Sequence, residues 1–127
     1  MLATIIDSFD AAHKLYMGAK TEMENKHIYG RCCDLHGHTY KLKVTIEGSV
    51  QEDGMIVNFK EIKSITKSVT GILDHGFLND YIKLPTAENI IKYLWEQLEP
   101  AFRVKSLTLY ELVLFENEDL YITMHNQ

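Results

Sequence analysis

The sequence predicts a single α+β domain in which two helices cover one face of a small antiparallel sheet of four strands. Three observations predict this fold. The chain has 127 residues, which is enough for one hydrophobic core but not for two. Its composition, 46% hydrophobic and 24% charged residues, is that of a globular protein. Segments with strand periodicity lie on both sides of two segments with helical periodicity, so we expect residues 1–127 to form one domain.

The first part of the chain predicts two strands with a short helix between them. Residues 2–13 (LATIIDSFDAAH) are rich in strand-forming residues, and residues 38–48 (HTYKLKVTIEG) alternate apolar with polar side chains. Between these segments, Thr21 and Glu24 have the spacing of a capping box, and Gly30 can end a short helix over residues 22–29.

The middle of the chain predicts two longer helices. The first starts after Asn58, with Glu61 at the third helical position, and its expected apolar stripe is Phe59, Ile62, Ile65, Val69 and Ile72. The second follows Pro85, with Thr86 as its N-cap and Pro100 as its stop. Its expected apolar stripe is Ile90, Ile91, Leu94, Trp95 and Leu98.

The last part of the chain predicts two further strands. Residues 104–124 (VKSLTLYELVLFENEDLYITM) form two apolar stretches around an ENED turn. The order strand, strand, helix, helix, strand, strand favours an antiparallel sheet with helices on one face. Such a sheet has two open edges and a second, partly apolar face, which pairing with other subunits would cover. We therefore expect a homo-oligomer.

Charge and cysteine content exclude several classes of protein. Thirteen Lys and Arg against eighteen Asp and Glu give a formal charge of −5, which argues against a nucleic-acid or anionic-membrane partner. No segment approaches the length of a membrane span, and the amino terminus lacks the pattern of a signal peptide. Cys32 and Cys33 are adjacent and form no disulfide framework. We therefore expect a cytoplasmic protein with reduced thiols.

Three histidines predict a metal site. His36 and His38 are two residues apart on a strand, so their side chains point the same way, and antiparallel pairing would bring His13 beside them. Three nitrogen ligands are typical of an open zinc site, whereas the alternative is polar residues at a strand end. Cys32 is either a fourth ligand that closes the site or a nucleophile or base beside it. Cys33 has the same chemistry, and we expect one of the two thiols to be buried and apolar.

Three acidic or basic residues outside this set are candidates for acid–base catalysis or ligand binding. Asp74 and His75, in the phrase GILDHGFLND, are typical of an oriented general acid or base, and a simple turn is the alternative. Glu111 interrupts a face that would carry Leu107, Leu109, Val113 and Phe115. Such a carboxylate is costly unless it is paired. It is either an edge residue in contact with water or a carboxylate that binds an amidine-like heterocycle through two hydrogen bonds.

In these phrases the sequence resembles the superfamily of 6-pyruvoyl-tetrahydropterin synthase and 6-carboxy-5,6,7,8-tetrahydropterin synthase. The resemblance runs nearly from end to end. It rests on six phrases in the family's order: FDAAH, C-x-x-x-HGH-x-Y-K-L, GMIVNFKEIK, LDHGFLND, PTAENI-x-x-x-LWE and LYEL. The resemblance implies the T-fold (tunnelling fold), whose subunits join into a β-barrel and commonly form a hexamer of two stacked trimers.

The resemblance also assigns the site residues. It implies a zinc ion held by His13, His36 and His38. Cys32 would be the catalytic thiolate base, with Asp74 and His75 as its partners in a triad. Glu111 would anchor the pterin ring, and Thr86 and Glu88 would support the pocket. Because 127 residues hardly enclose a pterin, we expect the active sites to lie between subunits.

The implied substrate is 7,8-dihydroneopterin triphosphate, and the branch of the family decides the product. The carboxy branch releases acetaldehyde and triphosphate, leaves 6-carboxy-5,6,7,8-tetrahydropterin and feeds queuosine and other 7-deazaguanines, whereas the pyruvoyl branch keeps the three-carbon side chain. The three-residue gap between Cys32 and HGH, with LHGHTYKLKV, resembles the carboxy branch. The long stretch from His13 to Cys32 resembles the pyruvoyl branch. We expect the carboxy branch.

One alternative comes from another functional class. A zinc-stabilised binding module without catalysis would use Cys32 as its fourth ligand. Four basic side chains flank the expected site in the sequence and are candidates to bind the triphosphate: Lys14, Lys20, Lys26 and Arg31. A charged surface loop is the simpler interpretation for most of them. His27, His125 and Cys33 receive no role from the sequence.

Overall fold

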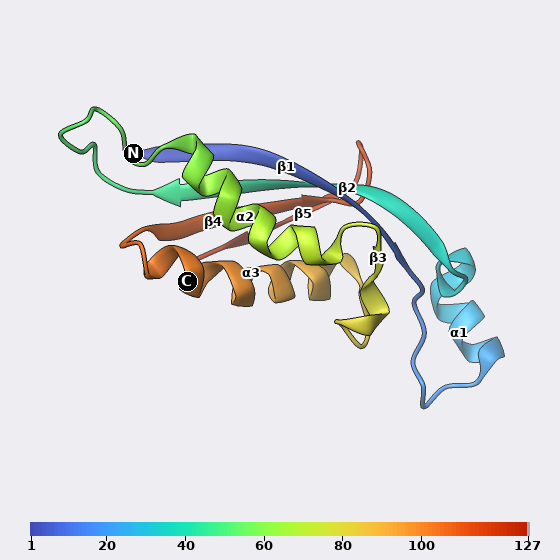
Figure 1. The fold of residues 1–127 in the computed structure, drawn as a ribbon. Helices are drawn as coiled ribbons and strands as arrows, with labels where there is room; N and C mark the ends of the chain where they lie inside the picture. The colour runs from blue at the N-terminus through green and yellow to red at the C-terminus, as the bar shows by residue number, and fades with distance from the viewer. Residues whose placement is uncertain (127) are drawn as a thin grey trace.

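The computed structural model describes residues 1–126 and contains one mixed sheet with three α-helices (Figure 1). The strands are β1 (Leu2–His13), β2 (His36–Glu47), β3 (Gly76–Phe77), β4 (Thr108–Phe115) and β5 (Tyr121–His125). The helices are α1 (Glu22–Tyr29), α2 (Phe59–Leu73) and α3 (Ala87–Arg103), with short 3₁₀ turns η1 (Gly30–Cys33) and η2 (Leu78–Asp80). The predicted α+β class is confirmed.

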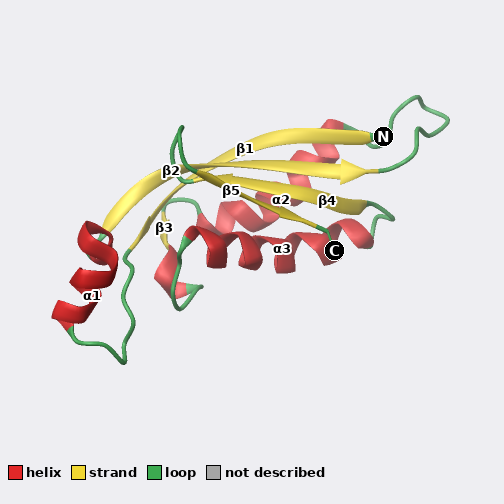
Figure 2. Cartoon of the chain, turned by 180° about the vertical axis from the view of Figure 1, so that it is seen from behind, coloured by secondary structure: helices red, strands yellow, loops and turns green. Residues whose placement is uncertain are grey.

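The sheet has the strand order β3-β1-β2-β4-β5. The four expected strands pair antiparallel, whereas the two-residue strand β3 pairs parallel to β1 through Ala11 and Ala12. The sequence did not predict β3, because two residues are too few to show a periodicity. Both α2 and α3 pack on one face of the sheet, and Figure 2 shows the other face without a helix.

The core lies between the sheet and the two long helices. It is built from alternate residues of β1, β2 and β4 together with one face of each helix. Phe9 and Tyr40 are fully buried and stack at 5.2 Å between ring centroids. Tyr40 is two residues after His38 on β2, so this pair forms the part of the core nearest the expected metal site.

Helix α1 stands apart from the core at the end of the long β1–β2 pair (Figure 1). Its predicted capping box is present: Thr21 Oγ1 accepts the Glu24 N–H at 3.1 Å, and Glu24 Oε1 accepts the Thr21 N–H at 3.0 Å. Gly30 ends the helix with a φ of 58°, a conformation that favours glycine. The predicted bounds, residues 22–29, are confirmed.

The buried face of α2 differs from the prediction. Its buried residues are Ile62, Thr66, Thr70 and Leu73, whereas Phe59 is 58% exposed and Ile72 is 60% exposed. Thr70 takes part in the core face because Asp7 of β1 lies opposite it, and Thr70 Oγ1 donates to the Asp7 carboxylate at 2.7 Å. The Oγ1 of the buried Thr66 has no hydrogen-bond partner among the described residues. Apolar spacing alone therefore misplaced both ends of the stripe.

Helix α3 does not stop at Pro100 as predicted, but continues to Arg103. A proline inside a helix removes one backbone hydrogen bond and costs about 3 kcal/mol. Phe102, which is fully buried, packs into the core from the added turn, and its burial offsets much of this cost. No helix within residues 1–126 is both long and apolar enough to cross a membrane.

Candidate active site

Three histidines meet at one end of the sheet. In the β1–β2 register His13 is opposite His36 and Ala11 is opposite His38, so the three side chains lie together on the helix-covered face. Their ring centroids are 4.5 to 5.2 Å apart. One nitrogen of each ring lies within 4.8 Å of the others, an arrangement that can hold a metal ion. His13 is buried and the other two are half-buried.

Backbone carbonyls fix the orientation of two of these rings. Nδ1 of His13 donates to the Pro85 carbonyl at 2.8 Å, and Nδ1 of His36 donates to the Asp34 carbonyl at 2.7 Å. A carbonyl only accepts, so each Nδ1 carries the proton and each Nε2 presents a lone pair. These two Nε2 atoms face each other at 3.0 Å. Metal-binding histidines are commonly oriented in this way.

The electrostatics of the cluster favour neutral imidazoles at His13 and His38. Burial lowers the pKa of His13 and of His38, and the neighbouring imidazoles lower both further. The neutral rings are therefore ready to bind a metal. Nε2 of His38 is buried without a hydrogen-bond partner, and Glu116 Oε1 lies 3.5 Å away in a geometry that is not a hydrogen bond. The unpartnered nitrogen and the facing lone pairs fit a metal ion with three imidazole ligands.

We expect the metal-free protein to lose stability as the pH falls below about 6.5. In the folded chain the pKa of His13 and of His38 lies below the ordinary value of 6.5. Below this pH the unfolded chain binds protons that the folded chain excludes, so the free energy of unfolding decreases. Urea unfolding from about pH 7.5 to 5.5 measures the effect. Equal or greater stability at the lower pH would contradict it.

Asp74 and His75 are held against β1 by one residue, Asp10. The Asp10 N–H donates to Asp74 Oδ1 at 2.8 Å, and the His75 N–H donates to the Asp10 carbonyl at 2.6 Å. The other carboxylate oxygen, Oδ2 of Asp74, lies 3.2 Å from Nδ1 of His75. The hydrogen bond from Asp10 lowers the pKa of Asp74, and His75 lowers it further. Asp74 is thus an anion that orients the imidazole.

The tight turn at His75 places this imidazole beside the end of β1. His75 has a φ of 60°, and a Cβ on the next residue, Gly76, would lie 2.9 Å from the Leu73 carbonyl oxygen. Only glycine fits there, and the chain turns back along β1. His75 and His38 then line one cavity of about 420 Å³ together with Asp10 and Thr39. The side chain of His75 is 80% exposed, so it lies at the mouth of this cavity.

The two cysteines lie in η1, beyond the end of the sheet. The Cys32 carbonyl accepts the Leu15 N–H at 2.8 Å, which ties η1 to the segment just after His13. Both thiols are half-buried, so the expectation of one buried, apolar cysteine is wrong, because η1 packs outside the core. The fourth-ligand alternative requires Cys32 Sγ to lie among the ligand atoms of the histidine cluster. Within residues 1–126 it does not.

Three of the four flanking cations share a cavity near the cysteines. Lys14, Lys20 and Lys26 line a space of about 330 Å³ together with Cys33 and Asp34. Arg31 is exposed and does not line this cavity. Lys14 and Lys20 therefore approach the cysteine end of the site from the β1–α1 connection, and Lys26 approaches it from α1.

Glu111 shares a face with Val113 and Phe115, as the sequence predicted, but not with Leu109. A β-bulge between its neighbours makes Thr45 the partner of Glu111 and Ile46 the partner of Leu109, so Tyr110 is an extra residue. Leu109, Leu112 and Leu114 therefore point into the core, and Glu111 lies on the helix-free face. Nε2 of His125 donates to Glu111 Oε2 at 2.6 Å. The sequence missed His125, because no local pattern marks a partner 14 residues away.

Within one chain, Glu111 and the histidine cluster lie far apart. Thr45, the neighbour of Glu111, is seven residues from His38 along β2, a separation of about 20 Å at the rise of an extended strand. By contrast, the start of α3 lies against the cluster through the Pro85 carbonyl. Thr86 Oγ1 caps this helix by accepting the Asn89 N–H at 3.2 Å, and Glu88 is exposed in its first turn.

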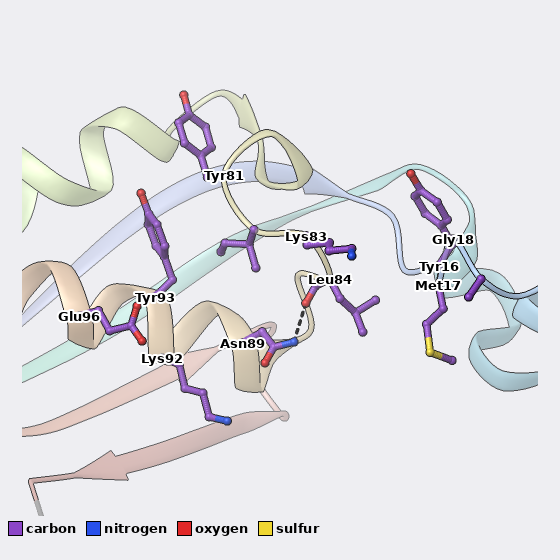
Figure 3. Close-up of a pocket in the computed structure, with 12 residues that line it drawn as sticks. Tyr16, Met17, Gly18, Tyr81, Lys83, Leu84, Asn89, Lys92, Tyr93 and Glu96 are labelled. Carbon is purple, nitrogen blue, oxygen red and sulfur yellow. Dashed lines mark hydrogen bonds between the residues drawn. The ribbon is translucent and has the colours of Figure 1, made fainter.

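A larger cavity of about 690 Å³ contains none of the predicted site residues. It lies between the segment of Tyr16, Met17 and Gly18, the loop before α3, and α3 itself (Figure 3). Within it Asn89 Nδ2 donates to the Leu84 carbonyl at 2.8 Å, which holds the loop against the helix. This cavity is more apolar than the one beside His38, and within residues 1–126 none of its lining residues belongs to a group that could hold a metal ion.

The family is decided by a match over almost the whole chain. The model of the 6-pyruvoyl tetrahydropterin synthase family matches residues 3–127. The chain belongs to this family. The predicted resemblance is confirmed, and the sheet with its helices is the T-fold of 6-pyruvoyl tetrahydropterin synthases.

Relatives of this chain are named either as 6-pyruvoyl or as 6-carboxy synthases. The chain is 37% identical to the 6-pyruvoyl tetrahydrobiopterin synthase of Dictyostelium discoideum, covering 100% of this chain and 97% of the relative. It is 35% identical to a protein of Archaeoglobus fulgidus provisionally named 6-carboxy-5,6,7,8-tetrahydropterin synthase, covering 94% and 90%. The solved 6-pyruvoyl tetrahydropterin synthase of Caenorhabditis elegans has a TM-score of 0.89 at 28% identity, covering 100% and 96%. The relatives are thus named for two different reactions.

Proposed function

We propose that the chain is a zinc-dependent lyase that acts on 7,8-dihydroneopterin triphosphate. The observation that carries the proposal is the three-histidine cluster, with two Nε2 atoms oriented by backbone carbonyls, beside the cavity that His38 shares with His75. His13, His36 and His38 hold the metal. The half-exposed thiols suit a reducing compartment, and we infer that the enzyme works in the cytoplasm.

The proton transfers use groups from three segments. Zinc, when bound, supplies a Lewis acid that lowers the pKa of substrate hydroxyl groups. Cys32, as a thiolate, removes a proton from the substrate side chain, and triphosphate leaves by elimination. His75 returns a proton, and the Asp74 carboxylate 3.2 Å from its Nδ1 keeps the imidazole oriented. We propose that Lys14, Lys20 and Lys26 meet the triphosphate, which their shared cavity beside the cysteines supports.

The pterin ring requires a second subunit in this proposal. Glu111 accepts hydrogen bonds from the ring's amino group and the adjacent ring nitrogen, with Thr86 and Glu88 supporting the pocket. Glu111 lies about 20 Å along β2 from the histidines of its own chain, so the ring anchor comes from a neighbouring subunit. The open outer edge of β5 and the exposed Leu2, Ile6 and Tyr121 on the helix-free face support an assembly. We propose a hexamer of two stacked trimers joined into a β-barrel.

We propose the carboxy branch, in which the enzyme forms 6-carboxy-5,6,7,8-tetrahydropterin for queuosine and other 7-deazaguanines. The short gap between Cys32 and His36 and the 35% identity to the Archaeoglobus fulgidus relative support it. The second candidate is the pyruvoyl reaction. Two observations favour that candidate: the 37% identity to the Dictyostelium discoideum relative and the similarity to the Caenorhabditis elegans structure.

Product analysis tests the branch. We expect the zinc-loaded protein to convert 7,8-dihydroneopterin triphosphate and one water to 6-carboxy-5,6,7,8-tetrahydropterin, with one acetaldehyde and one triphosphate released per turnover. Acetaldehyde is measured with a coupled dehydrogenase, and the pterin by liquid chromatography with mass detection. The Cys32→Ala variant serves as the control for background decay of the substrate. A pyruvoyl product without acetaldehyde would overturn the carboxy assignment in favour of the second candidate.

A further inference from the structure

Asp10 brings a carboxylate, as well as its backbone groups, to the cavity that His38 and His75 line. Asp10 of β1 and Thr39 of β2 are direct cross-strand partners, and their side chains point away from the core. Thr39 Oγ1 donates to Asp10 Oδ1 at 2.5 Å. Both residues line the cavity of about 420 Å³. The Thr39 hydroxyl thus holds the Asp10 carboxylate in one orientation at the cavity wall.

The two carboxylates beside His75 differ in how far they are already engaged. Oδ1 of Asp74 accepts the Asp10 N–H at 2.8 Å, and its Oδ2 lies 3.2 Å from His75 Nδ1. Among residues 1–126, Thr39 is the hydrogen-bond donor to the Asp10 carboxylate, and it uses Oδ1. Oδ2 of Asp10 therefore keeps its acceptor sites for a ligand, and the residue is exposed.

The position of Asp10 defines which part of a ligand it would meet. One oxygen of Asp10, one oxygen of Asp74 and one ring nitrogen of His75 all lie within 4.8 Å of one another. A ligand atom that exchanges a proton with His75 therefore lies beside the Asp10 carboxylate as well. Two carboxylates repel a phosphate group, whereas a hydroxyl group can donate a hydrogen bond to either oxygen of Asp10.

We propose that Asp10 is a specificity-determining residue, whose carboxylate accepts a hydrogen bond from a hydroxyl group on the substrate side chain. The inference rests on the proposed function, in which His75 returns a proton to that side chain. It also orients the substrate, because the hydroxyl-bearing carbons lie at Asp10 and the triphosphate points away from it. A hydrogen bond to a charged group is worth about tenfold to 100-fold in affinity.

Substitutions of Asp10 test its side chain without removing the clamp on Asp74 and His75, because the clamp uses the backbone N–H and carbonyl of Asp10. Asp10→Ala removes the acceptor, whereas Asp10→Asn keeps an oxygen acceptor without the charge. Asp80→Ala, at an exposed position of η2, is the matched control for loss of a negative charge. Two fluorescent pterins are titrated into each zinc-loaded protein: neopterin, which carries the side-chain hydroxyls, and 6-methylpterin, which lacks them.

We expect Asp10→Ala to raise the dissociation constant for neopterin and the KM for the triphosphate substrate about tenfold, and Asp10→Asn to raise both about threefold. Both variants should bind 6-methylpterin within about twofold of native, and Asp80→Ala should bind both pterins as the native protein does. A role of Asp10 in the fold alone would not distinguish the two pterins.

Three other outcomes would overturn the inference. An equal loss for both pterins would show that Asp10 supports the ring site or the fold rather than a hydroxyl group. Neopterin binding and KM within about twofold of native in Asp10→Ala would show that its carboxylate makes no contact, while turnover by the native protein would leave the proposed function standing. A native protein that neither binds neopterin nor turns over the triphosphate would overturn the proposed function and this inference with it.

Discussion

Replacing Cys32 with alanine should abolish turnover while leaving about one zinc ion per chain. The expected loss of kcat is about 10²-fold to 10⁴-fold, the usual contribution of a general acid or base. We expect zinc to be retained because, within residues 1–126, the candidate ligand group consists of three histidine nitrogens and includes no sulfur atom. Cys32 is half-buried at the periphery, so loss of its Sγ leaves the core intact. Steady-state kinetics and metal analysis of the same sample measure the two quantities.

Cys33→Ala is the matched control for this prediction. Cys33 belongs to the same 3₁₀ turn, is equally half-buried, and its Sγ lies 3.9 Å from Asp34 Oδ1. We expect its turnover to stay within about threefold of native. Loss of zinc from Cys32→Ala would show that the thiol is a metal ligand. The chain would then fit the alternative of a zinc-stabilised module without catalysis.

Replacing His36 with alanine should remove both the metal and the activity. The remaining two imidazoles form an incomplete site. Removing a residue that only orients a metal ligand lowers metal affinity about 10-fold to 100-fold, so loss of a ligand itself should lower it by more than about 100-fold. His36 is half-buried at the start of β2, so the fold should persist. Zinc content after dialysis, circular dichroism and kcat are the measurements.

His27→Ala controls for the loss of a histidine as such. His27 is exposed on α1, away from the metal cluster, and its variant should keep native zinc content and turnover. A His36→Ala protein that still binds one zinc ion per chain with native affinity would contradict the assignment of His13, His36 and His38 as the ligand set.

Most of the histidine cluster was predictable because it depends on regular structure. Alternation along β1 and β2 places His36 and His38 on one face, and antiparallel pairing places His13 opposite them. The roles of Pro85 and Asp34 were not predictable, because their carbonyls reach the histidines only through the tertiary fold. A side chain's type and spacing are local properties, whereas the hydrogen bond of His13 to a backbone carbonyl 72 residues away is not.

Irregular features account for the errors. The bulge at Tyr110 inserts one residue into β4 and reverses which side chains face the core, and an alternating pattern of leucines does not reveal it. The helix end at Pro100 was misplaced because the burial of Phe102 outweighs a local preference. The clamp by Asp10 on Asp74 and His75 was missed because it uses the backbone of Asp10 rather than its side chain.

In the proposed assembly, the histidine cluster of one chain and Glu111 of another form one active site. Co-expression of Cys32→Ala and Glu111→Gln chains with two different affinity tags, followed by purification on both tags, gives a mixed oligomer. Each variant alone should be nearly inactive. Random mixing should restore about one quarter of native triphosphate release, because about that share of sites receives both native groups. A mixed oligomer as inactive as its parents would contradict the claim.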